Sequence, residues 1–319
     1  MNKERTTEQI VPHVIDIVIP AYNARETIQN SVKATLFQEL PANWKKNVII
    51  IDDGSSDDTA PFCESIFEGR VQVISSKQNR GRSSSRNTGW RSGTGQYTVF
   101  LDADCEWNTT GSLAAHLKVL EAGADVSTGA IFAHGQDFWA AYQNNLQMVR
   151  EHDFNSGNLA AFTSANFAIR RSILEAIGGF DEGYGHYGFE DRDFFLRLIA
   201  FGANVSFCPD ASVIHTLDSS LKSICWKMMD SGEHSSLRFQ MAHTEYYVRT
   251  MYGKIDCRLH GFPLTLIGAF FNDLIPGLAR LGDNVINISG VPFKIKLMLV
   301  KLISGIAYLT GTYRGYRGK

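Results

Sequence analysis

The sequence predicts an α/β protein with a mostly parallel central sheet and helices on both faces. Short apolar runs, rich in β-branched residues, recur at 14–19, 48–51, 71–75 and 97–101. Segments with helical spacing separate these runs, and polar turns follow them. Runs of this kind are typical of buried strands, and their alternation with helices is typical of parallel sheets.

The elements can be predicted in order along the chain. Pro20 ends the first strand, and Asn23 with Glu26 forms a capping-box pattern that predicts a helix over 23–38. Further on we expect a turn at 52–57, helices at 59–67 and 86–93, a glycine- and arginine-rich loop at 79–85, and a last strand at 211–214. After 215 the pattern becomes helical.

Composition and charge narrow the function classes. The 319 residues are 44% hydrophobic and 20% charged, which fits one large globular domain, or one domain plus an appendage, and excludes a disordered chain. The net charge of −2 disfavours a nucleic-acid partner. Five cysteines without a Cys-x-x-Cys pair favour reduced thiols, and neither a signal peptide nor a long apolar run is evident, so we expect a cytoplasmic protein.

The C-terminal segment differs from the rest of the chain. Residues 261–319 contain seven basic and two acidic residues, and their apolar stretches lie at 262–271 and 297–308. Lys294 and Lys301 are seven residues apart, so they share one helix face. Two hypotheses remain open: the segment lies peripherally on the anionic inner face of the cell membrane, or it packs as a helical cap on the rest of the chain.

Carboxylates follow two of the predicted strands. Asp102-Ala103-Asp104 stands directly after the strand at 97–101, where its two carboxylates can reach one Mg²⁺ or Mn²⁺ ion. Asp52-Asp53-Gly54-Ser55 follows the second strand, where one carboxylate can accept a hydrogen bond from a pyrimidine imide and the other can serve the turn. A solvated turn is the alternative for both.

The loop at 79–85 and the residues after it favour a diphosphate ligand. It reads Asn79-Arg80-Gly81-Arg82 and continues to Arg86, which combines backbone freedom with guanidinium groups. A solvated basic loop is the alternative. The turn after the first strand holds no glycine, and no phosphate-binding loop motif is present, so NAD-binding and P-loop proteins are disfavoured.

Glu190-Asp191 begins a predicted helix whose apolar face carries Phe194, Phe195 and Leu198. Carboxylates in a first turn are favoured by the helix dipole, so ordinary capping is one interpretation. The preceding loop, 183–188, is rich in glycine and aromatic residues, which favours a shaped site where a carboxylate deprotonates a sugar hydroxyl. His215, at a strand end, is either structural or a third metal ligand.

These motifs together resemble glycosyltransferase family 2. The resemblance rests on the ordered segments Ile17–Asn23, Ile51–Thr59, Asn79-x-Gly81 with Arg86-Asn87-x-Gly89, Asp102-x-Asp104 and Glu190-Asp191. It covers about residues 14–215. It implies a Rossmann-like GT-A fold, an α/β/α sandwich, with a nucleotide-sugar half at 14–105 and an acceptor half at 106–215. A polar tail at 1–13 precedes it, and a helical extension at 216–319 follows.

The resemblance also implies roles for individual residues. Asp191 is the expected general base of an inverting transfer, and Glu190 shapes the acceptor side. Asp104, Asp102 and His215 are expected to hold Mn²⁺ or Mg²⁺. The acceptor side is expected to include Asn166, Gly179 and Tyr187. The nucleotide sugar is expected to lie against Pro20, Tyr22, Asn23, Asp52, Asp53, Asn79, Arg80, Gly81, Arg86, Asp102 and Ala103.

The chain lacks the Gln-x-x-Arg-Trp motif of processive family members, which favours transfer of a single sugar. We expect a nucleoside-diphosphate sugar as donor, with uridine favoured and thymidine or guanosine open. The expected acceptor is a saccharide or a lipid-linked saccharide in cell-surface polysaccharide or glycolipid synthesis. A non-catalytic scaffold on the same fold is the alternative, whereas a nucleotidyltransferase is disfavoured because the 20–25 turn lacks its glycine-rich loop.

Overall fold

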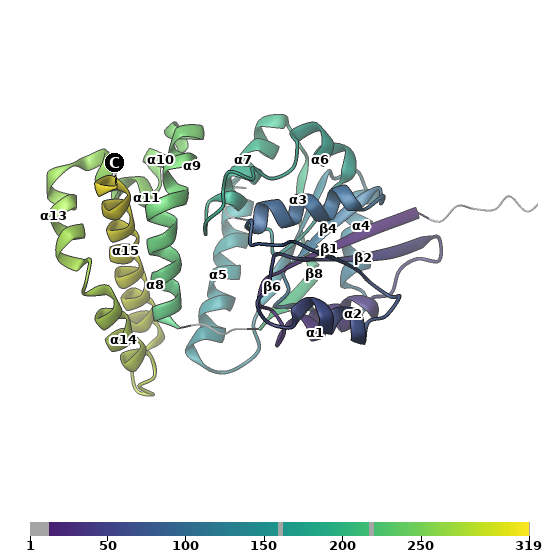
Figure 1. Ribbon diagram of the computed structural model, residues 1–319, viewed down its shortest axis with the longest axis horizontal. Helices are drawn as coiled ribbons and strands as arrows, with labels where there is room; N and C mark the ends of the chain where they lie inside the picture. The colour runs from purple at the N-terminus through teal and green to yellow at the C-terminus, as the bar shows by residue number, and fades with distance from the viewer. Residues whose placement is uncertain (1–12, 159–161, 217–219, 319) are drawn as a thin grey trace, which may run out of the picture.

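The computed structural model describes residues 13–158, 162–216 and 220–318, so all of the predicted tail except His13 lies outside the described residues. An eight-stranded sheet forms the centre of the α/β part (Figure 1). Its strands, in spatial order, are β3 (Gln72–Ser75), β2 (Trp44–Asp52), β1 (His13–Ala21), β4 (Tyr97–Leu101), β7 (Asn166–Arg170), β6 (Val126–Phe132), β8 (Val205–His215) and β5 (Cys105–Trp107).

The sheet is mostly parallel, as predicted. Strands β3, β2, β1 and β4 run in one direction, and β6 and β8 are parallel to each other. β7 runs antiparallel to β4 and β6, and β5 runs antiparallel to β8. Because β1, β2 and β4 are parallel neighbours, the residues that follow them gather at one edge of the sheet, where ligands of such sheets bind.

Two apolar layers cover the faces of the sheet. Along β1, Ile15, Ile17 and Ile19 enter one core while Val18 enters the other, as the period of two in a strand requires. The helices of this part are α1 (Ile28–Leu36), α2 (Thr59–Ile66), α3 (Arg82–Ser92), α4 (Ser112–Glu121), α5 (Phe138–Asn155), α6 (Arg171–Ile177) and α7 (Glu190–Phe201). The predicted α/β/α sandwich is therefore confirmed.

The predicted start of the first helix is wrong. Asn23 has a positive φ of 49°, and its Oδ1 accepts the Ser56 backbone N–H at 2.8 Å instead of capping a helix. The helix begins at Ile28, after Thr27, which makes no side-chain cap bond. Asn23 thus ties the turn after β1 to the turn after β2. The predicted loop at 79–85 is also shorter, because α3 begins at Arg82.

The C-terminal region is helical, as predicted. Its core joins Leu221 and Met229 of α8 to Ala279 and Val300. Its elements are α8 (Leu221–Asp230), a π-helical turn (Ser231–Ser235), α9 (Ser236–Ala242), α10 (Thr244–Arg249), α11 (Met251–Lys254), α12 (Cys257–His260), α13 (Phe262–Phe271), α14 (Ile275–Ile286) and α15 (Phe293–Arg317).

The helical region also contacts the α/β part. Arg238 donates two hydrogen bonds to the Asp181 carboxylate, at 2.7 and 2.8 Å. The rings of Phe138 on α5 and Phe293 on α15 lie 5.6 Å apart between centroids. Among the described helices none is by itself long and apolar enough to cross a membrane, although α13 and α14, bent by 72°, together meet that test of length and composition.

Gly311 allows α15 to cross α8 closely, and we predict that Gly311→Ala destabilises the helical region. A Cβ at this position would lie 2.1 Å from the Met229 carbonyl oxygen, so the helices must separate. We expect a loss of about 1–3 kcal/mol in the free energy of unfolding, measured by urea denaturation. Gly277→Ala in α14 is the control, because no atom lies within 4 Å of its Cβ position. The control is expected to be neutral or slightly stabilising. Equal losses in both variants would contradict the packing argument.

Candidate active site

Most of the predicted nucleotide-binding residues line one cavity at the carboxyl edge of the sheet. The cavity has a volume of about 520 Å³ and lies beside the ends of β1, β2 and β4. The predicted residues that line it are Pro20, Tyr22, Asn23, Asp53, Asn79, Gly81, Asp102, Ala103, Asp104, Tyr187 and His215. We call it the first cavity.

A second cavity, of about 480 Å³, adjoins the first and contains the predicted catalytic pair. Glu190 and Asp191 line it together with Arg86. Residues that line both cavities form the boundary between them: Arg82, Asp102, Asp104, Tyr187, His215 and Lys227. The predicted metal ligands therefore lie where the two cavities meet.

Asp52 and Arg80 line neither cavity. Asp52 is 5% exposed, and its Oδ1 accepts the Ser55 backbone N–H within the turn. Arg80 points to solvent, 3.7 Å from the Glu182 carboxylate. Their neighbours Asp53 and Arg82 line the first cavity instead. Of the two predicted aspartates only Asp53 lines the cavity, and Arg82, which was not among the predicted contacts, lines it where Arg80 was expected.

Asn166 and Gly179 also lie away from the cavities. The Asn166 side chain is buried, donates to the Ala211 carbonyl at 2.8 Å and contacts His116 Nε2 at 3.0 Å. Gly179 has a φ of 76°, and a Cβ there would meet Asn87 Oδ1 at 2.4 Å. Both residues thus stabilise the fold next to the site, and neither lines the cavities in which an acceptor would bind.

Asp53 holds the loop that follows β3. Its Oδ1 accepts the Arg80 backbone N–H at 2.9 Å, and its Oδ2 accepts the Gly81 N–H at 2.8 Å. Burial raises the pKa of this carboxyl, although both backbone hydrogen bonds oppose the shift. The carboxylate therefore fixes the backbone at the start of α3, which places Arg82 at the cavity wall.

Arg86 joins the two halves of the site. Its side chain is 1% exposed, and Nη2 lies 3.0 Å from Asp102 Oδ1. Nη1 lies 3.5 Å from Asp191 Oδ1 and 4.0 Å from Glu190 Oε1. One guanidinium on α3 thus contacts the residue that follows β4 and the first turn of α7.

The two adjacent carboxyls differ in their surroundings. Burial alone would raise the pKa of Asp191, but the charge of Arg86 and hydrogen bonds from Ser164 and Thr163 hold it below its ordinary value. Burial and the charge of Asp191 raise the pKa of Glu190 to about 7. Glu190 Oε2 is buried without a hydrogen-bond partner among the described residues. Asp191 is therefore ionised at neutral pH, whereas Glu190 is partly protonated.

Asp104 and His215 form a candidate metal pair. Asp104 Oδ2 lies 3.1 Å from His215 Nε2, because β5 and β8 pair Cys105 with His215. Asp102 turns toward Arg86 instead. One carboxylate and one imidazole leave coordination positions for further oxygen ligands, which a divalent cation such as Mn²⁺ takes. The donor set thus fits a divalent metal ion held mainly by Asp104 and His215.

Some lining residues were missed in the sequence. The cationic groups of Arg82 and Lys227 both lie over the ring of Tyr187, at 5.2 and 5.6 Å from its centroid. Arg82 belongs to the basic loop that predicted a diphosphate ligand, so its positive charge could have identified it as a lining residue. Lys227 comes from α8 in the helical region, and Arg150 of the second cavity comes from α5. The sequence around Lys227 and around Arg150 contains no motif that would predict a place for them in the site.

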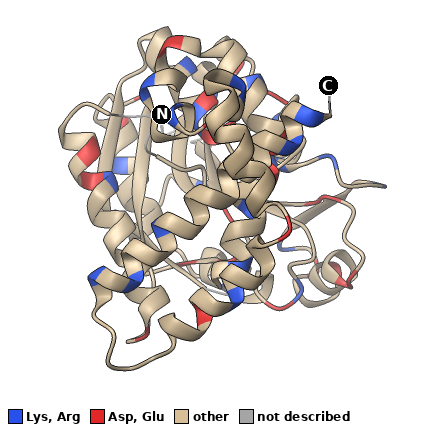
Figure 2. Cartoon of the chain, turned by 90° about the vertical axis from the view of Figure 1, so that its left-hand side faces the viewer, with Lys and Arg blue, Asp and Glu red and all other residues tan. Residues whose placement is uncertain are grey.

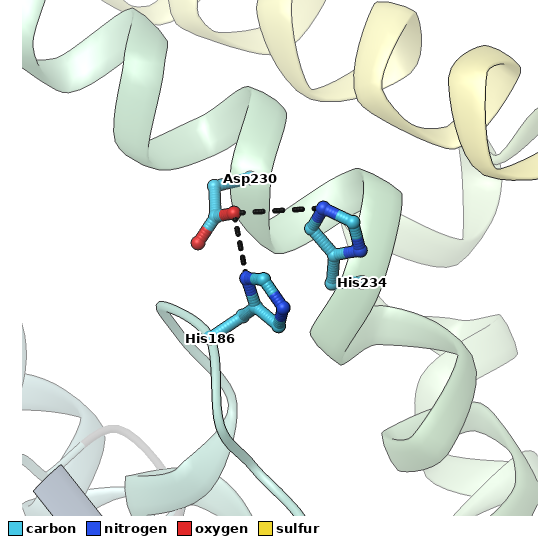
Figure 3. Close-up of side chains that lie close together, drawn as sticks. All are labelled: His186, Asp230 and His234. Carbon is cyan, nitrogen blue, oxygen red and sulfur yellow. Dashed lines mark hydrogen bonds and ion pairs between the residues drawn. The ribbon is translucent and has the colours of Figure 1, made fainter. Parts of the chain in front are cut away.

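His186, Asp230 and His234 connect the aromatic loop to the helical region at the first cavity (Figure 3). Asp230 Oδ1 lies 3.1 Å from His186 Nδ1 and 3.8 Å from His234 Nε2, and the two imidazole rings stack. Asp230 Oδ2 accepts the Tyr187 backbone N–H at 2.8 Å. The end of α8 therefore positions Tyr187, a residue of both cavities.

The raised pKa of Glu190 predicts a pH-dependent effect of Glu190→Gln. A carboxyl whose pKa rises from 4.5 to about 7 on folding stabilises the protein most below pH 4.5, and this contribution is lost as the pH rises through 7. Glutamine cannot ionise, so above pH 7 the variant should be more stable than the wild type by on the order of 2 kcal/mol, with little difference near pH 4.5. Denaturant titrations across this pH range measure the difference.

Glu182→Gln is the control, because its neighbours Asn87 and Arg91 overcome burial and lower the pKa of Glu182. That variant should lose stability at neutral pH and approach the wild type in acid. Stability curves for Glu190→Gln and wild type that run parallel across the pH range would refute the assigned environment of Glu190.

Two curated relatives support the sequence resemblance. The probable glycosyltransferase YdaM of Bacillus subtilis is 28% identical over 213 residues, which are 62% of this chain and 49% of that protein. The Escherichia coli enzyme WfaP, a UDP-Glc:α-D-GlcNAc-diphosphoundecaprenol β-1,3-glucosyltransferase, is 35% identical over 193 residues, 59% of this chain and 71% of the enzyme. The chain thus spans about half the length of the Bacillus relative.

Two solved structures show the same fold. A mannosyltransferase from Pyrobaculum calidifontis, in complex with GDP-Man and Mn²⁺, has a TM-score of 0.57 and 17% identity over 96% of this chain and 87% of its own. Residues 1–349 of S. aureus TarS, in complex with UDP, have a TM-score of 0.53 and 16% identity over 96% of this chain and 92% of theirs. They confirm the predicted GT-A fold.

Two family models match the chain in overlapping segments. Residues 148–217 match the model described as the N-terminal domain of galactosyltransferase. Residues 16–178, just over half of the chain, match the model of glycosyl transferase family 2 and include the carboxylates that follow β2 and β4. This chain therefore belongs to glycosyl transferase family 2.

Proposed function

We propose that this protein is an inverting glycosyltransferase that moves a single sugar from a nucleoside-diphosphate sugar to a hydroxyl group of a saccharide or lipid-linked acceptor. One observation carries the proposal: Asp191 lines the second cavity and not the first, and the two cavities meet at Asp104 and His215. A donor in the first cavity and an acceptor in the second would meet at that boundary. The hydroxyl can then attack the anomeric carbon from the side opposite the leaving diphosphate, which inverts that carbon.

The first cavity offers groups for both parts of a nucleoside diphosphate. Tyr22 and Asp53 line it with a ring and a carboxylate, and Asn79, Gly81 and Arg82 supply polar donors. An imide N–H of uracil would pair with a carboxylate there, so we favour UDP. The solved neighbours bind UDP in one case and GDP-Man in the other, which keeps guanosine among the donors to test.

Asp104 and His215 would hold Mn²⁺ or Mg²⁺, and the imidazole favours Mn²⁺. When bound, the metal ion supplies positive charge to the departing diphosphate. Arg82 adds a second positive charge from the boundary of the cavities. Two neighbours in the structure comparison contain Mn²⁺, which supports this assignment.

Asp191 is our proposed general base. Arg86 keeps it ionised, and hydrogen bonds from Ser164 and Thr163 fix its orientation. An ionised carboxylate beside the acceptor can remove the hydroxyl proton as the bond to the anomeric carbon forms. Glu190, partly protonated at neutral pH, would shape the acceptor side by donating or accepting a hydrogen bond.

We infer that the protein acts in cell-surface polysaccharide or glycolipid synthesis, at the cytoplasmic face of a membrane. WfaP and WfgD of E. coli are named for a lipid-linked acceptor, and TuaG of B. subtilis for teichuronic acid biosynthesis. A scaffold without activity on the same fold remains the competing hypothesis, and the ionised Asp191 in a cavity opposes it.

An apolar, basic face of the helical region supports membrane contact. Figure 2 looks onto these helices, most of whose residues are uncharged. Arg280 of α14 and Lys294 and Lys301 of α15 are exposed. Helices α13, α14 and α15 also expose large apolar side chains, among them Phe262, Leu266, Phe270, Leu281, Ile295, Met298 and Leu302. Apolar area together with basic residues is typical of surfaces that bind anionic lipid.

A nucleotide-binding experiment tests the donor and metal assignments together. UDP, dTDP, GDP and CDP are each added with and without Mn²⁺, and thermal stability is measured. One nucleotide should stabilise the protein only with Mn²⁺, by roughly 2.7 kcal/mol at about 100 times its dissociation constant. Asp104→Ala should abolish this shift, because it removes half of the metal pair. Stabilisation by no nucleotide would favour the scaffold hypothesis.

Asp191→Asn separates binding from catalysis. This variant should keep the nucleotide-dependent stabilisation, because Asp191 lines only the second cavity. Its kcat for sugar transfer should fall about 10²- to 10⁴-fold, as expected for loss of a general base. Transfer at the wild-type rate would rule out Asp191 as the base.

Membrane contact predicts that Lys294→Gln combined with Lys301→Gln weakens vesicle binding. Each lysine near an anionic surface contributes about 1 kcal/mol, so the double variant should bind phosphatidylglycerol vesicles roughly tenfold or more weakly in a sedimentation assay. Lys33→Gln with Lys77→Gln, two exposed lysines of the α/β part, is the control of equal charge. Equal binding by both double variants and wild type would contradict the assigned face.

A further inference from the structure

The second cavity contains arginines that the catalytic assignments do not use. Arg86 is committed to the carboxylates around it, and Arg82 also lines the first cavity. Arg150 and Arg192 line the second cavity only. Their positive charge therefore lies in the second cavity, where the proposed acceptor would bind.

Arg150 lacks a partner in the part of the chain that the structure describes. It lies near the end of α5 and forms no hydrogen bond or ion pair there, and its Nη1 is buried. A buried charge without a partner is costly, so such groups are normally paired. Burial also lowers the pKa of Arg150 despite the nearby charge of Asp191.

Arg192 lies in the first turn of α7, next to the proposed base. Its guanidinium carbon lies over the Tyr252 ring at 5.3 Å from the centroid, and the side chain makes no hydrogen bond or ion pair with any described residue. A cation is unfavourable at a helix N-terminus, so stabilisation of the helix does not explain its position. Its five N–H donors remain available to a ligand in the cavity.

We propose that Arg150 and Arg192 bind a phosphate group of the acceptor, so that the acceptor is a phosphate or diphosphate ester. Guanidinium groups match phosphate oxygens with paired, charge-assisted hydrogen bonds. Ile224 and Met228 of α8 and Ser304 of α15 line the same cavity, so an apolar tail attached to that phosphate would run along the helical region. This inference rests on the proposed function, whose acceptor it specifies.

The test uses the full chain with its first cavity filled by UDP and Mn²⁺. Geranyl diphosphate, inorganic pyrophosphate and geraniol are titrated by calorimetry as probes for a lipid-linked anion, a free anion and an uncharged lipid. Both anions should bind, geranyl diphosphate more tightly, and geraniol should not bind measurably. Arg150→Gln combined with Arg192→Gln should weaken both anions at least about tenfold, because two charge-assisted contacts are lost.

Matched variants make the result specific. Arg249→Gln removes an exposed arginine that lines neither cavity and should leave anion binding unchanged. Arg150→Lys with Arg192→Lys keeps the charge and should recover part of the affinity. Circular dichroism checks that each variant is folded.

Two outcomes would overturn the inference. One is unchanged geranyl diphosphate binding in the folded double glutamine variant. The other is binding of the anions only when UDP is left out, which would place them in the first cavity. If none of UDP, dTDP, GDP and CDP binds, the proposed function is at fault, and pyrophosphate titration without nucleotide still compares the double glutamine variant with wild type.

Discussion

The buried guanidinium of Arg86 holds the site together. It contacts Asp102 from one half of the α/β part and the pair Glu190 and Asp191 from the other. Desolvating one arginine is costly, but surrounding carboxylates offset the cost. Arg86 reaches this position because α3 lies close to the sheet, where a Cβ on Gly89 would meet Val18 Cγ1 at 2.2 Å. A glycine in the helix thus permits the contact on which the proposed base depends.

The sequence predicted the strands and the edge where the site forms, because buried parallel strands leave long apolar runs. It did not predict which of two neighbouring residues faces the cavity. Asp52 still pairs within the sheet, opposite Ala21 and Ser75, whereas Asp53 is the first residue beyond it. Arg82 turns inward because α3 begins there, one residue after Gly81 with its positive φ. Such choices depend on where each element ends, and local composition leaves that open by a residue or two.

The contribution of the helical region could not be read from local patterns. Lys227 and Asp230 lie beyond every motif in the sequence, yet both line the first cavity. On α8 they fall three residues apart, as expected for neighbours on one helical face, and a solvated helix would show the same spacing. Only the packing of α8 against the loop at 183–188 distinguishes the two cases. The helical region is therefore part of the site wall as well as a cap.

The second cavity contains more cations than the first, and its charges bear on the acceptor that we propose. Four carboxylates line the second cavity, Asp102, Asp104, Glu190 and Asp191, and together they would repel an anionic acceptor. Arg86 contacts three of them, and partial protonation of Glu190 removes part of the negative charge. Together with Arg82, Arg86 and Lys227, Arg150 and Arg192 bring the lining to five cations against four carboxylates. A neutral saccharide would need no such excess, whereas a phosphate ester would, because its own charge must be held beside an ionised base.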